Sequence, residues 1–158
     1  VPFAARGRRL EECVHVLRKL WRGGRVEHHG EFYDFDALEM SPVPRQPIPI
    51  WGGGTSDPAL RRAATQLDGW ASEIHTRAEV CDLSARLQAW RRESDRASEP
   101  FGICAAVRDA FTPDHYQEMA DHGVTSLITV PWLLYGMTED DVTKKCDAIR
   151  RFGDEVIR

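Results

Sequence analysis

The sequence predicts an α/β protein with a parallel sheet, built either as an open doubly wound sheet or as part of a (βα)8 barrel. Short apolar segments of strand length alternate with amphipathic segments of helix length, which is typical of parallel strands joined by crossover helices. The spacing of these segments favours the barrel. The chain has 158 residues and starts with an amphipathic segment that no strand precedes. Because a complete (βα)8 barrel needs about 250 residues, we expect about half of one.

The N-terminal third predicts a helix, a hairpin and a connector. In residues 4–22 apolar side chains recur at steps of three and four, as on the buried face of a helix. Residues 26–35 (VEHHGEFYDF) resemble two short strands around a turn. The proline-rich residues 39–47 indicate an extended connector. We interpret residues 24–47 as an insertion within a single partial domain, residues 1–158.

Residues 47–70 (PIPIWGGGTSDPALRRAATQLDGW) contain the central unit of the chain. The apolar run that ends at Trp51 predicts a buried strand, and the three glycines after it predict a turn. Ser56 or Asp57 is suited to cap a helix whose first residue is Pro58. Such a turn is either merely tight or binds a phosphate, because the free N–H groups of a helix start favour an anion. The run has neither the Rossmann glycine spacing nor the lysine of a P-loop.

Three more strand–helix units are predicted after this one. The strands are expected at residues 69–72, 101–107 and 124–130. Thr76 and Glu79 form a capping box for a helix to about Arg92, and Thr112-Pro113 opens a second helix. Thr138 is expected to cap the last one. The predicted apolar stripe of that last helix consists of Val142, Cys146, Ile149, Phe152 or Gly153, and Val156.

The composition excludes several classes of function. The hydrophobic fraction is 42% and the charged fraction 29%, values of a soluble globular protein. The formal net charge is −4 with both signs interspersed, so we expect no nucleic-acid partner. No apolar run approaches the roughly 20 residues of a membrane span, and VPFAARGRRL at the N-terminus is unlike a secretory signal. We therefore expect a cytoplasmic protein without a membrane partner.

The cysteines and the paired histidines predict no metal site. The four cysteines form no C-x-x-C pair, which favours reduced, buried thiols over a disulfide or a zinc site. His28 and His29 are adjacent, and adjacent side chains of a strand point to opposite faces. A surface hairpin is therefore the better interpretation of residues 26–35.

Polar side chains follow the predicted strands, at the edge where barrel enzymes keep their chemistry. Glu73 and His75 follow one strand, and Arg108 and Asp109 follow the next. The guanidinium of Arg108 suits an anionic part of a cofactor, but a structural salt bridge with Asp109 or another acid is an equal alternative. Trp132 occupies a similar place after a later strand.

Six motifs in a fixed order resemble the luciferase-like monooxygenase superfamily. They are R-G-R-R-L-E-E (6–12), L-R-K-L-W (17–21), H-G-E-F-Y (29–33), P-R-Q-P-I-P-I-W-G-G (44–53), A-L-R-R-A-A (59–64) and D-G-W (68–70). The match is dense over residues 6–72 and looser over residues 73–158. The resemblance implies the C-terminal half of a (βα)8 TIM barrel: the end of the fourth helix, the insertion, and units five to eight.

The resemblance also implies a cofactor, F420 or FMN, and a place for its phosphate. In the family the phosphate lies after the fifth strand, which corresponds here to Gly52, Gly53, Gly54, Thr55 and Ser56. The acid/base residue and much of the substrate pocket lie on the first four strands of relatives. No catalytic residue is therefore assigned in this chain.

Three functional hypotheses follow. The first is a flavin- or F420-dependent oxidoreductase acting on a small molecule, with the deazaflavin branch favoured, whose C-terminal part is not competent alone. The second is a non-catalytic half-barrel that dimerises, because four parallel strands with bare edges invite self-pairing. We therefore expect a homo-oligomer or a need for the other half. The third is an open α/β sheet with its own small-ligand site at the glycine turn.

Overall fold

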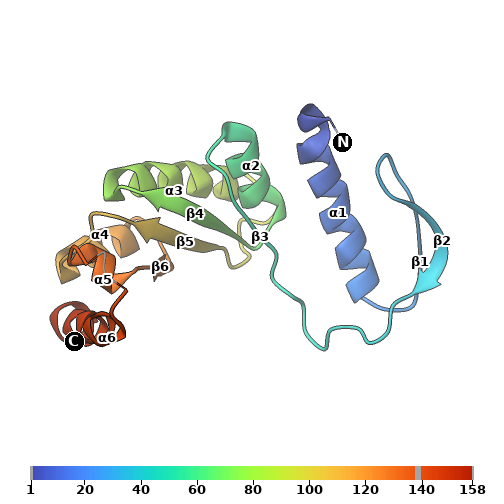
Figure 1. Ribbon diagram of the computed structural model, residues 1–158. Coiled ribbons are helices and arrows are strands. Elements are labelled where there is room, and N and C mark those ends of the chain that lie inside the picture. Colours follow the sequence, from blue (N-terminus) through green and yellow to red (C-terminus); the bar gives the residue numbers. More distant parts are fainter. Residues whose placement is uncertain (1, 138–139, 158) are drawn as a thin grey trace. The chain divides into compact units, whose positions relative to one another are not determined.

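The computed structural model describes residues 2–137 and 140–157, which divide into two compact units, residues 1–50 and residues 51–158 (Figure 1). In the first unit a short 3-10 turn, η1 (Phe3–Ala5), leads into helix α1 (Arg6–Trp21). Strands β1 (Arg25–His29) and β2 (Asp34–Glu39) then pair antiparallel. The predicted helix and hairpin are confirmed.

A carboxylate of α1 holds the turn of this hairpin. The Glu12 side chain accepts hydrogen bonds from the backbone N–H groups of Phe32, at 3.0 Å, and Tyr33, at 2.8 Å. The Nε2 atom of His28 lies 3.0 Å from the same carboxylate. A Cβ atom at Gly30 would collide with both the Glu12 carboxylate and the His28 ring. Glycine at position 30 therefore makes room for this group, which we call the Glu12 clasp.

The second unit is a four-stranded parallel sheet with helices between its strands. Its strands are β3 (Trp51–Gly52), β4 (Gly69–His75), β5 (Gly102–Val107) and β6 (Ser126–Ile128), in the order β3-β4-β5-β6. Its helices are α2 (Asp57–Gln66), α3 (Arg77–Arg92), α4 (Pro113–Asp121), α5 (Pro131–Leu134), α6 (Val142–Phe152) and the final π-helical turn η2 (Gly153–Ile157). Sequential parallel strands confirm the predicted alternation.

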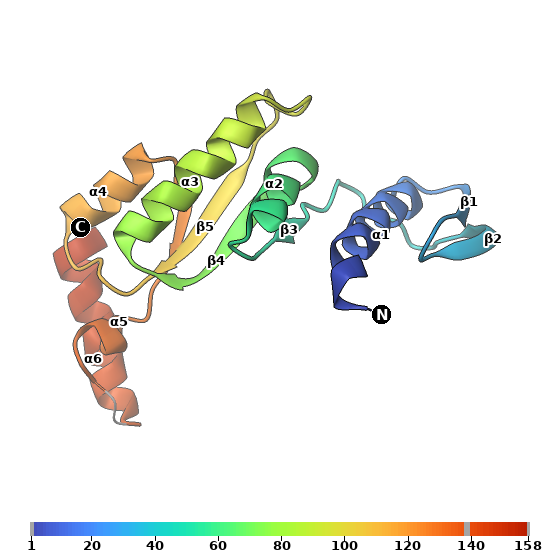
Figure 2. The ribbon, with the colours of Figure 1, turned by 90° about the horizontal axis from the view of Figure 1, so that it is seen from above.

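Helices cover one face of this sheet. Figures 1 and 2 show α3 lying along β4 and β5, and α2 packs on β3 and β4. The layer between sheet and helices holds the core. Its fully buried side chains include Trp70 and Ile103 from the strands, Leu60 from α2, and Val80 and Leu87 from α3. The predicted capping box of Thr76 and Glu79 is present at the start of α3.

On the opposite face of the sheet, several apolar side chains of the described part of residues 51–158 are exposed, and we call this the bare face. Residues paired across neighbouring strands share a face, so Ile74 and Ile128, both paired with Ala106, lie on one row. Their exposed fractions are 64% and 53%. A second row starts with Trp51, whose ring covers the positions where Cβ atoms of Gly69 and Gly102 would lie. One covered and one bare face are what half of a closed barrel presents.

Two predictions about the buried strands and cysteines are wrong. The run before Trp51 is not strand: β3 has only two residues, Ile48 is 46% exposed, and Trp51 itself lies on the bare face. The four cysteines are free, as predicted, but each is half-buried rather than buried. Strand β4 extends to His75, beyond the predicted end at residue 72.

The predicted stripe of the last helix is also wrong. Val142 and Ile149 are 71% and 49% exposed, whereas Ala148 and Phe152 are buried. The Phe152 ring meets Tyr116 of α4 edge-on at 5.9 Å, and this contact fixes which side of α6 faces inward. The predicted cap Thr138 lies outside the described residues. The N-cap of α6 is Asp141.

Candidate functional site

The β3–α2 loop, residues 53–56, follows the carboxyl end of a parallel strand and is exposed throughout. Gly54 has a φ of +90°, a backbone conformation that only glycine adopts without strain. The indole N–H of the buried Trp70 donates to the carbonyl oxygen of Gly54 at 2.9 Å. A core residue of β4 thus stabilises the conformation of the loop.

The loop keeps its N–H groups available. Within the described residues, the backbone N–H groups of Gly54, Thr55 and Ser56 have no protein acceptor. Ser56 is the N-cap of α2, and its carbonyl accepts from Ala59 at 2.9 Å and Leu60 at 3.0 Å, while its side chain makes no capping bond. The positive end of the α2 dipole adds to this group of donors. Such an arrangement favours an anion.

The glycines of the loop lie close to neighbouring protein atoms. A Cβ atom at Gly53 would lie 3.3 Å from the backbone oxygen of Ala71, and one at Gly54 would lie 3.2 Å from the Cβ of Ala59. At Gly52 an added Cβ would come within 2.5 Å of the Leu67 side chain, so that glycine serves packing. Gly53 and Gly54 thus allow the loop to approach β4 and α2 closely, and Gly52 supports the turn.

A cavity of about 500 Å³ lies beside this loop. Its lining residues are Thr55, His75, Ala78, Glu79, Asp82, Leu83 and Arg86. Thr55 comes from the loop, His75 from the carboxyl end of β4, and the others from the first turns of α3. Thr55, from the predicted phosphate loop, and His75, one of the polar residues predicted after the next strand, thus line the same cavity.

His75 lies at the cavity wall, near Glu79. Its Nδ1 atom lies 3.7 Å from a carboxylate oxygen of Glu79, and its side chain is 19% exposed. Its Nε2 atom is buried and has no hydrogen-bond partner among the described residues. The Glu79 carboxylate accepts from the backbone N–H and hydroxyl of Thr76, at 2.7 Å and 2.9 Å. These hydrogen bonds lower the pKa of Glu79, so it stays ionised.

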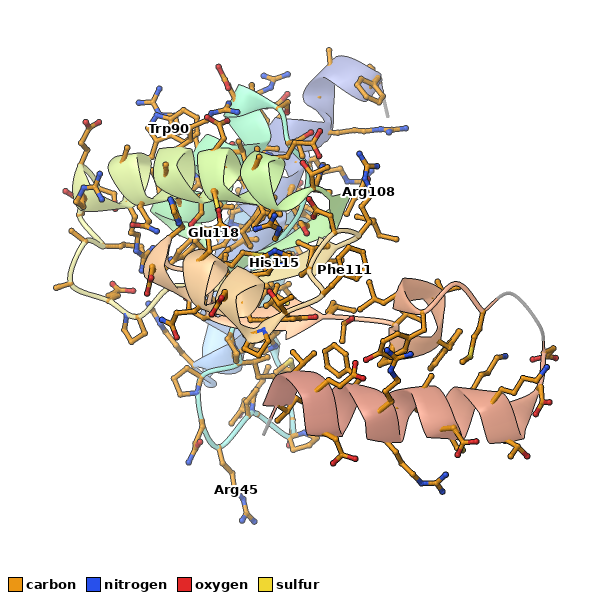
Figure 3. The ribbon with its side chains drawn as sticks, turned by 90° about the vertical axis from the view of Figure 1, so that its left-hand side faces the viewer. Arg45, Trp90, Arg108, Phe111, His115 and Glu118 are labelled. Carbon is orange, nitrogen blue, oxygen red and sulfur yellow. The ribbon has the colours of Figure 1, made fainter. Side chains whose placement is uncertain are left out.

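The remaining charges of the cavity are compensated. Arg86 pairs with Asp57, at the first residue of α2, and lies 3.8 Å from Asp82. Its guanidinium also stacks 5.7 Å from the ring centre of Trp90, which Figure 3 labels on α3. The cavity wall is therefore polar, with no unpaired cation of its own. Sequence reasoning missed Asp82 and Arg86, although their spacing of four residues on a helix was a signal.

Arg108 and Asp109 do not line this cavity. Asp109 binds α3 rather than its neighbour Arg108: the backbone N–H of Arg77 donates to it at 2.8 Å. Of the predicted partners of Arg108, Asp109 is therefore wrong, and the acid on which the Arg108 charge acts is Glu79, whose pKa it helps to lower. The backbone N–H of Arg108 donates to the carbonyl of His75 at 3.0 Å. Its side chain is exposed at the carboxyl end of β5 (Figure 3).

Trp132 and His29, two candidates from the sequence, have structural partners, and Phe111 contacts His115. Trp132 lies 5.7 Å from the Lys145 ammonium. Phe111 is 50% exposed after β5, and its N–H donates to the His115 ring at 3.1 Å (Figure 3). His29 pairs with Asp34 on the hairpin at 2.7 Å. No group of His, Cys, Asp and Glu side chains in the described part of the chain is arranged to hold a metal.

Comparison with known proteins decides the family. A model of the luciferase-like monooxygenase family matches residues 1–147. An uncharacterized protein of Mycobacterium tuberculosis is 41% identical over 160 residues, which cover 99% of this chain and 54% of that protein. The chain belongs to the luciferase-like monooxygenase family. This confirms the resemblance drawn from the six motifs.

Two other relatives are more distant. An F420-dependent glucose-6-phosphate dehydrogenase of Gordonia bronchialis is 35% identical over 71% of this chain and 34% of its own length. A pyrimidine monooxygenase RutA of Cronobacter sakazakii is 27% identical over 80% of this chain and 40% of its own length. The chain thus spans about half the length, or less, of these curated relatives.

A solved structure shows the same fold. The coenzyme F420-dependent tetrahydromethanopterin reductase of Methanopyrus kandleri superposes with a TM-score of 0.70 at 14% identity. The match covers 94% of this chain and 62% of the reductase. The predicted fold, half of a (βα)8 barrel, is confirmed, and the open-sheet alternative is wrong. None of the helices in the described ranges is long and apolar enough for a membrane span.

Proposed function

We propose that this chain is the C-terminal part of a flavin- or F420-dependent oxidoreductase, and that its β3–α2 loop binds the phosphate of FMN or F420. The observation that carries the proposal is the set of exposed backbone N–H groups at Gly54, Thr55 and Ser56, which have no acceptor in the described protein. Family membership supports it, since one relative is named as F420-dependent and another as a monooxygenase.

In this proposal the chain binds and orients the cofactor. The three N–H groups donate to phosphate oxygens, and the positive end of α2 stabilises their charge. Trp70 keeps the loop in shape through its bond to Gly54. When bound, the cofactor supplies the hydride or oxygen chemistry. Anchoring the phosphate at the carboxyl ends of the strands fixes where the rest of the cofactor lies.

Catalysis is proposed for the whole protein, on a small-molecule substrate, and not for these residues alone. No side chain in the described cavity is assigned as acid, base or nucleophile. We therefore expect the 158-residue chain to bind a cofactor without turning over a substrate. We also expect the protein to be cytoplasmic and to have no nucleic-acid or membrane partner.

The test is titration of the chain with FMN and with F420, followed by cofactor fluorescence. Thr55→Glu places a carboxylate in the loop, and repulsion of the phosphate is expected to weaken binding at least about tenfold. Thr143→Glu is the control, because Thr143 is also exposed but lies at the start of α6. Equal affinities in the two variants, or no binding of either cofactor by the unsubstituted chain, would overturn the proposal.

The alternative function is a non-catalytic half-barrel that assembles with a second copy through its open sheet. The bare face exposes Trp51, Ile74 and Ile128, at 41%, 64% and 53%. The edge strands β3 and β6 offer unpaired backbone groups, and exposed edges of this kind promote association. A second copy placed against this face would cover the apolar rows and complete eight strands.

Sedimentation distinguishes this alternative. The chain is expected to sediment as a dimer, and Ile74→Glu with Ile128→Glu is expected to produce a monomer. Val142→Glu is the matched control, since Val142 is 71% exposed on α6 and away from the sheet face. A stable monomer of the unsubstituted chain would exclude assembly through the sheet. So would a dimer that the double variant leaves intact.

A further inference from the structure

The bare face of the sheet carries a single acidic side chain. The residues of strands β3 to β6 are uncharged except for Glu73 and the titratable His75, both on β4. The His75 side chain is 19% exposed and lines the cavity on the helix-covered side. Glu73 is exposed and does not line that cavity. Its carboxylate therefore belongs to the bare face, among exposed apolar side chains.

A β-bulge sets the position of Glu73. Between Ala71 and Ile74, β4 contains one residue more than the facing part of β5, and this breaks the regular alternation of sides along the strand. The hydroxyl of Ser72 accepts a hydrogen bond from the backbone N–H of Ala106 at 2.8 Å, which holds the two strands together across the irregularity. Glu73 thus stands beside Ile74, next to the exposed apolar row.

The neighbouring elements do not neutralise this carboxylate. Within the described part of the chain, Glu73 makes no hydrogen bond or ion pair. On β5 the titratable residue of the bare face is Cys104, and Arg108 after the strand end is exposed and acts on the charge of Glu79. Glu79, at the start of α3, is itself negative, and the β3–α2 loop has no charged side chain. Water is therefore what stabilises the Glu73 charge in the single chain.

Assembly of two copies through the bare face would remove this charge from water. Two four-stranded sheets supply eight parallel strands, the number in a closed barrel. A two-fold contact presents the same patch from both copies, so Glu73 enters it twice, and the strands bring no cation to pair with it. Burying an ionised carboxylate without a partner is unfavourable, whereas the protonated carboxyl group is buried at a much smaller cost.

We infer that Glu73 controls the association of two copies through the bare face: the ionised carboxylate weakens the contact, and the protonated one permits tight assembly. This inference rests on the alternative function, assembly with a second copy. Inward-pointing charges are one means by which sheets avoid unwanted pairing. Here one carboxylate restrains the exposed row of Ile74 and Ile128 at neutral pH. Because each copy takes up a proton on assembly, the association constant rises as the pH falls.

The test is sedimentation equilibrium of the intact chain from neutral to mildly acid pH. Glu73→Gln keeps the shape of the side chain and removes its charge. At neutral pH this variant is expected to dimerise at least about tenfold more tightly than the unsubstituted chain, the equivalent of one pKa unit of differential interaction. Its dimerisation should also lose the pH dependence. Glu93→Gln is the control, because it changes the net charge equally at an exposed position that ends α3.

A second variant separates charge from hydrogen bonding. Glu73→Lys should stay weakly associated at mildly acid pH, because an ammonium group keeps its charge there. A dimer that Ile74→Glu with Ile128→Glu dissociates, but that Glu73→Gln leaves unchanged in strength and pH dependence, would overturn the inference and leave assembly through the sheet standing. Equal tightening by Glu93→Gln would overturn it as well. Monomers of both the unsubstituted chain and Glu73→Gln would overturn the inference together with the alternative function.

Discussion

The two units of the chain are stabilised in different ways. In residues 1–50 the buried apolar side chains are only Ala5, Val14 and Val16 among the described residues, and the hairpin is fastened by the Glu12 clasp. In residues 51–158 a layer of buried apolar side chains lies between the sheet and its helices. The first unit therefore depends on a hydrogen-bonded charge, and the second on removing apolar area from water.

This difference shows how one chain divides structural and functional tasks. The apolar layer of the second unit holds the strand ends in place, and through Trp70 it also fixes the candidate phosphate loop. The small first unit has too little apolar area to fold the same way, because a shorter chain buries a smaller fraction of its surface on folding. The Glu12 clasp replaces part of the missing core, and as a consequence the stability of the first unit depends on pH.

Truncating the apolar layer should have the largest effect. Leu87 is fully buried on α3, and Leu87→Ala is expected to cost the second unit about 2–5 kcal/mol in urea unfolding. Leu133→Ala removes the same atoms from a side chain that is 57% exposed and should cost less than about 0.5 kcal/mol. Similar costs at both positions would mean that the second unit is not held by this layer.

Neutralising the clasp should loosen the first unit only. Glu12→Gln removes the charge and replaces one acceptor oxygen by a donor, so one of the two hydrogen bonds to the Phe32 N–H is lost and the bonds that remain to Phe32 and Tyr33 are no longer charge-assisted. Hydrogen exchange at these two amides is expected to accelerate roughly tenfold. Glu39→Gln, on the exposed strand β2, is the control and should leave them unchanged. Acceleration at Leu87 as well would show that the units do not fold separately.

Acid should affect the two units at different pH values. Burial raises the pKa of Glu12, but the hydrogen bonds from Tyr33, His28 and Phe32 outweigh it, so the pKa lies below its ordinary value. A group with a depressed folded pKa stabilises above its unfolded pKa, about 4.3 for Glu, and this stabilisation is lost as the pH falls through the folded pKa.

The acid effect on the second unit should be smaller. Its carboxylates with lowered pKa include Glu79 and Glu99, whose side chains are 54% and 49% exposed and therefore screened by water. In an NMR titration from neutral to acid pH, the signals of Phe32 and Tyr33 should be lost before those of Leu87. Simultaneous loss would contradict the contrast between the units.

The predictions from sequence succeeded where the interactions were local. The capping box of Thr76 and Glu79 and the order of strands and helices follow from residues close together in the chain. The predicted strand around Ile48 and the predicted stripe of α6 failed, because hydrophobicity alone does not say which neighbour is present to cover it. The partner of Asp109 was missed for the same reason: Arg77 is 32 residues away.

For the candidate site, too, local features could be predicted from the sequence and contacts between distant residues could not. The sequence by itself determined the family, the strand–turn–helix order and the glycine loop at residues 52–56, since these depend on backbone preferences and motifs within a few residues. Only the tertiary structure decided that Trp51 lies on the bare face and that His75 lies beside Thr55. Parallel pairing of β3 with β4 brings those two strand ends together across 20 residues of chain, and no local pattern encodes which side chains then meet.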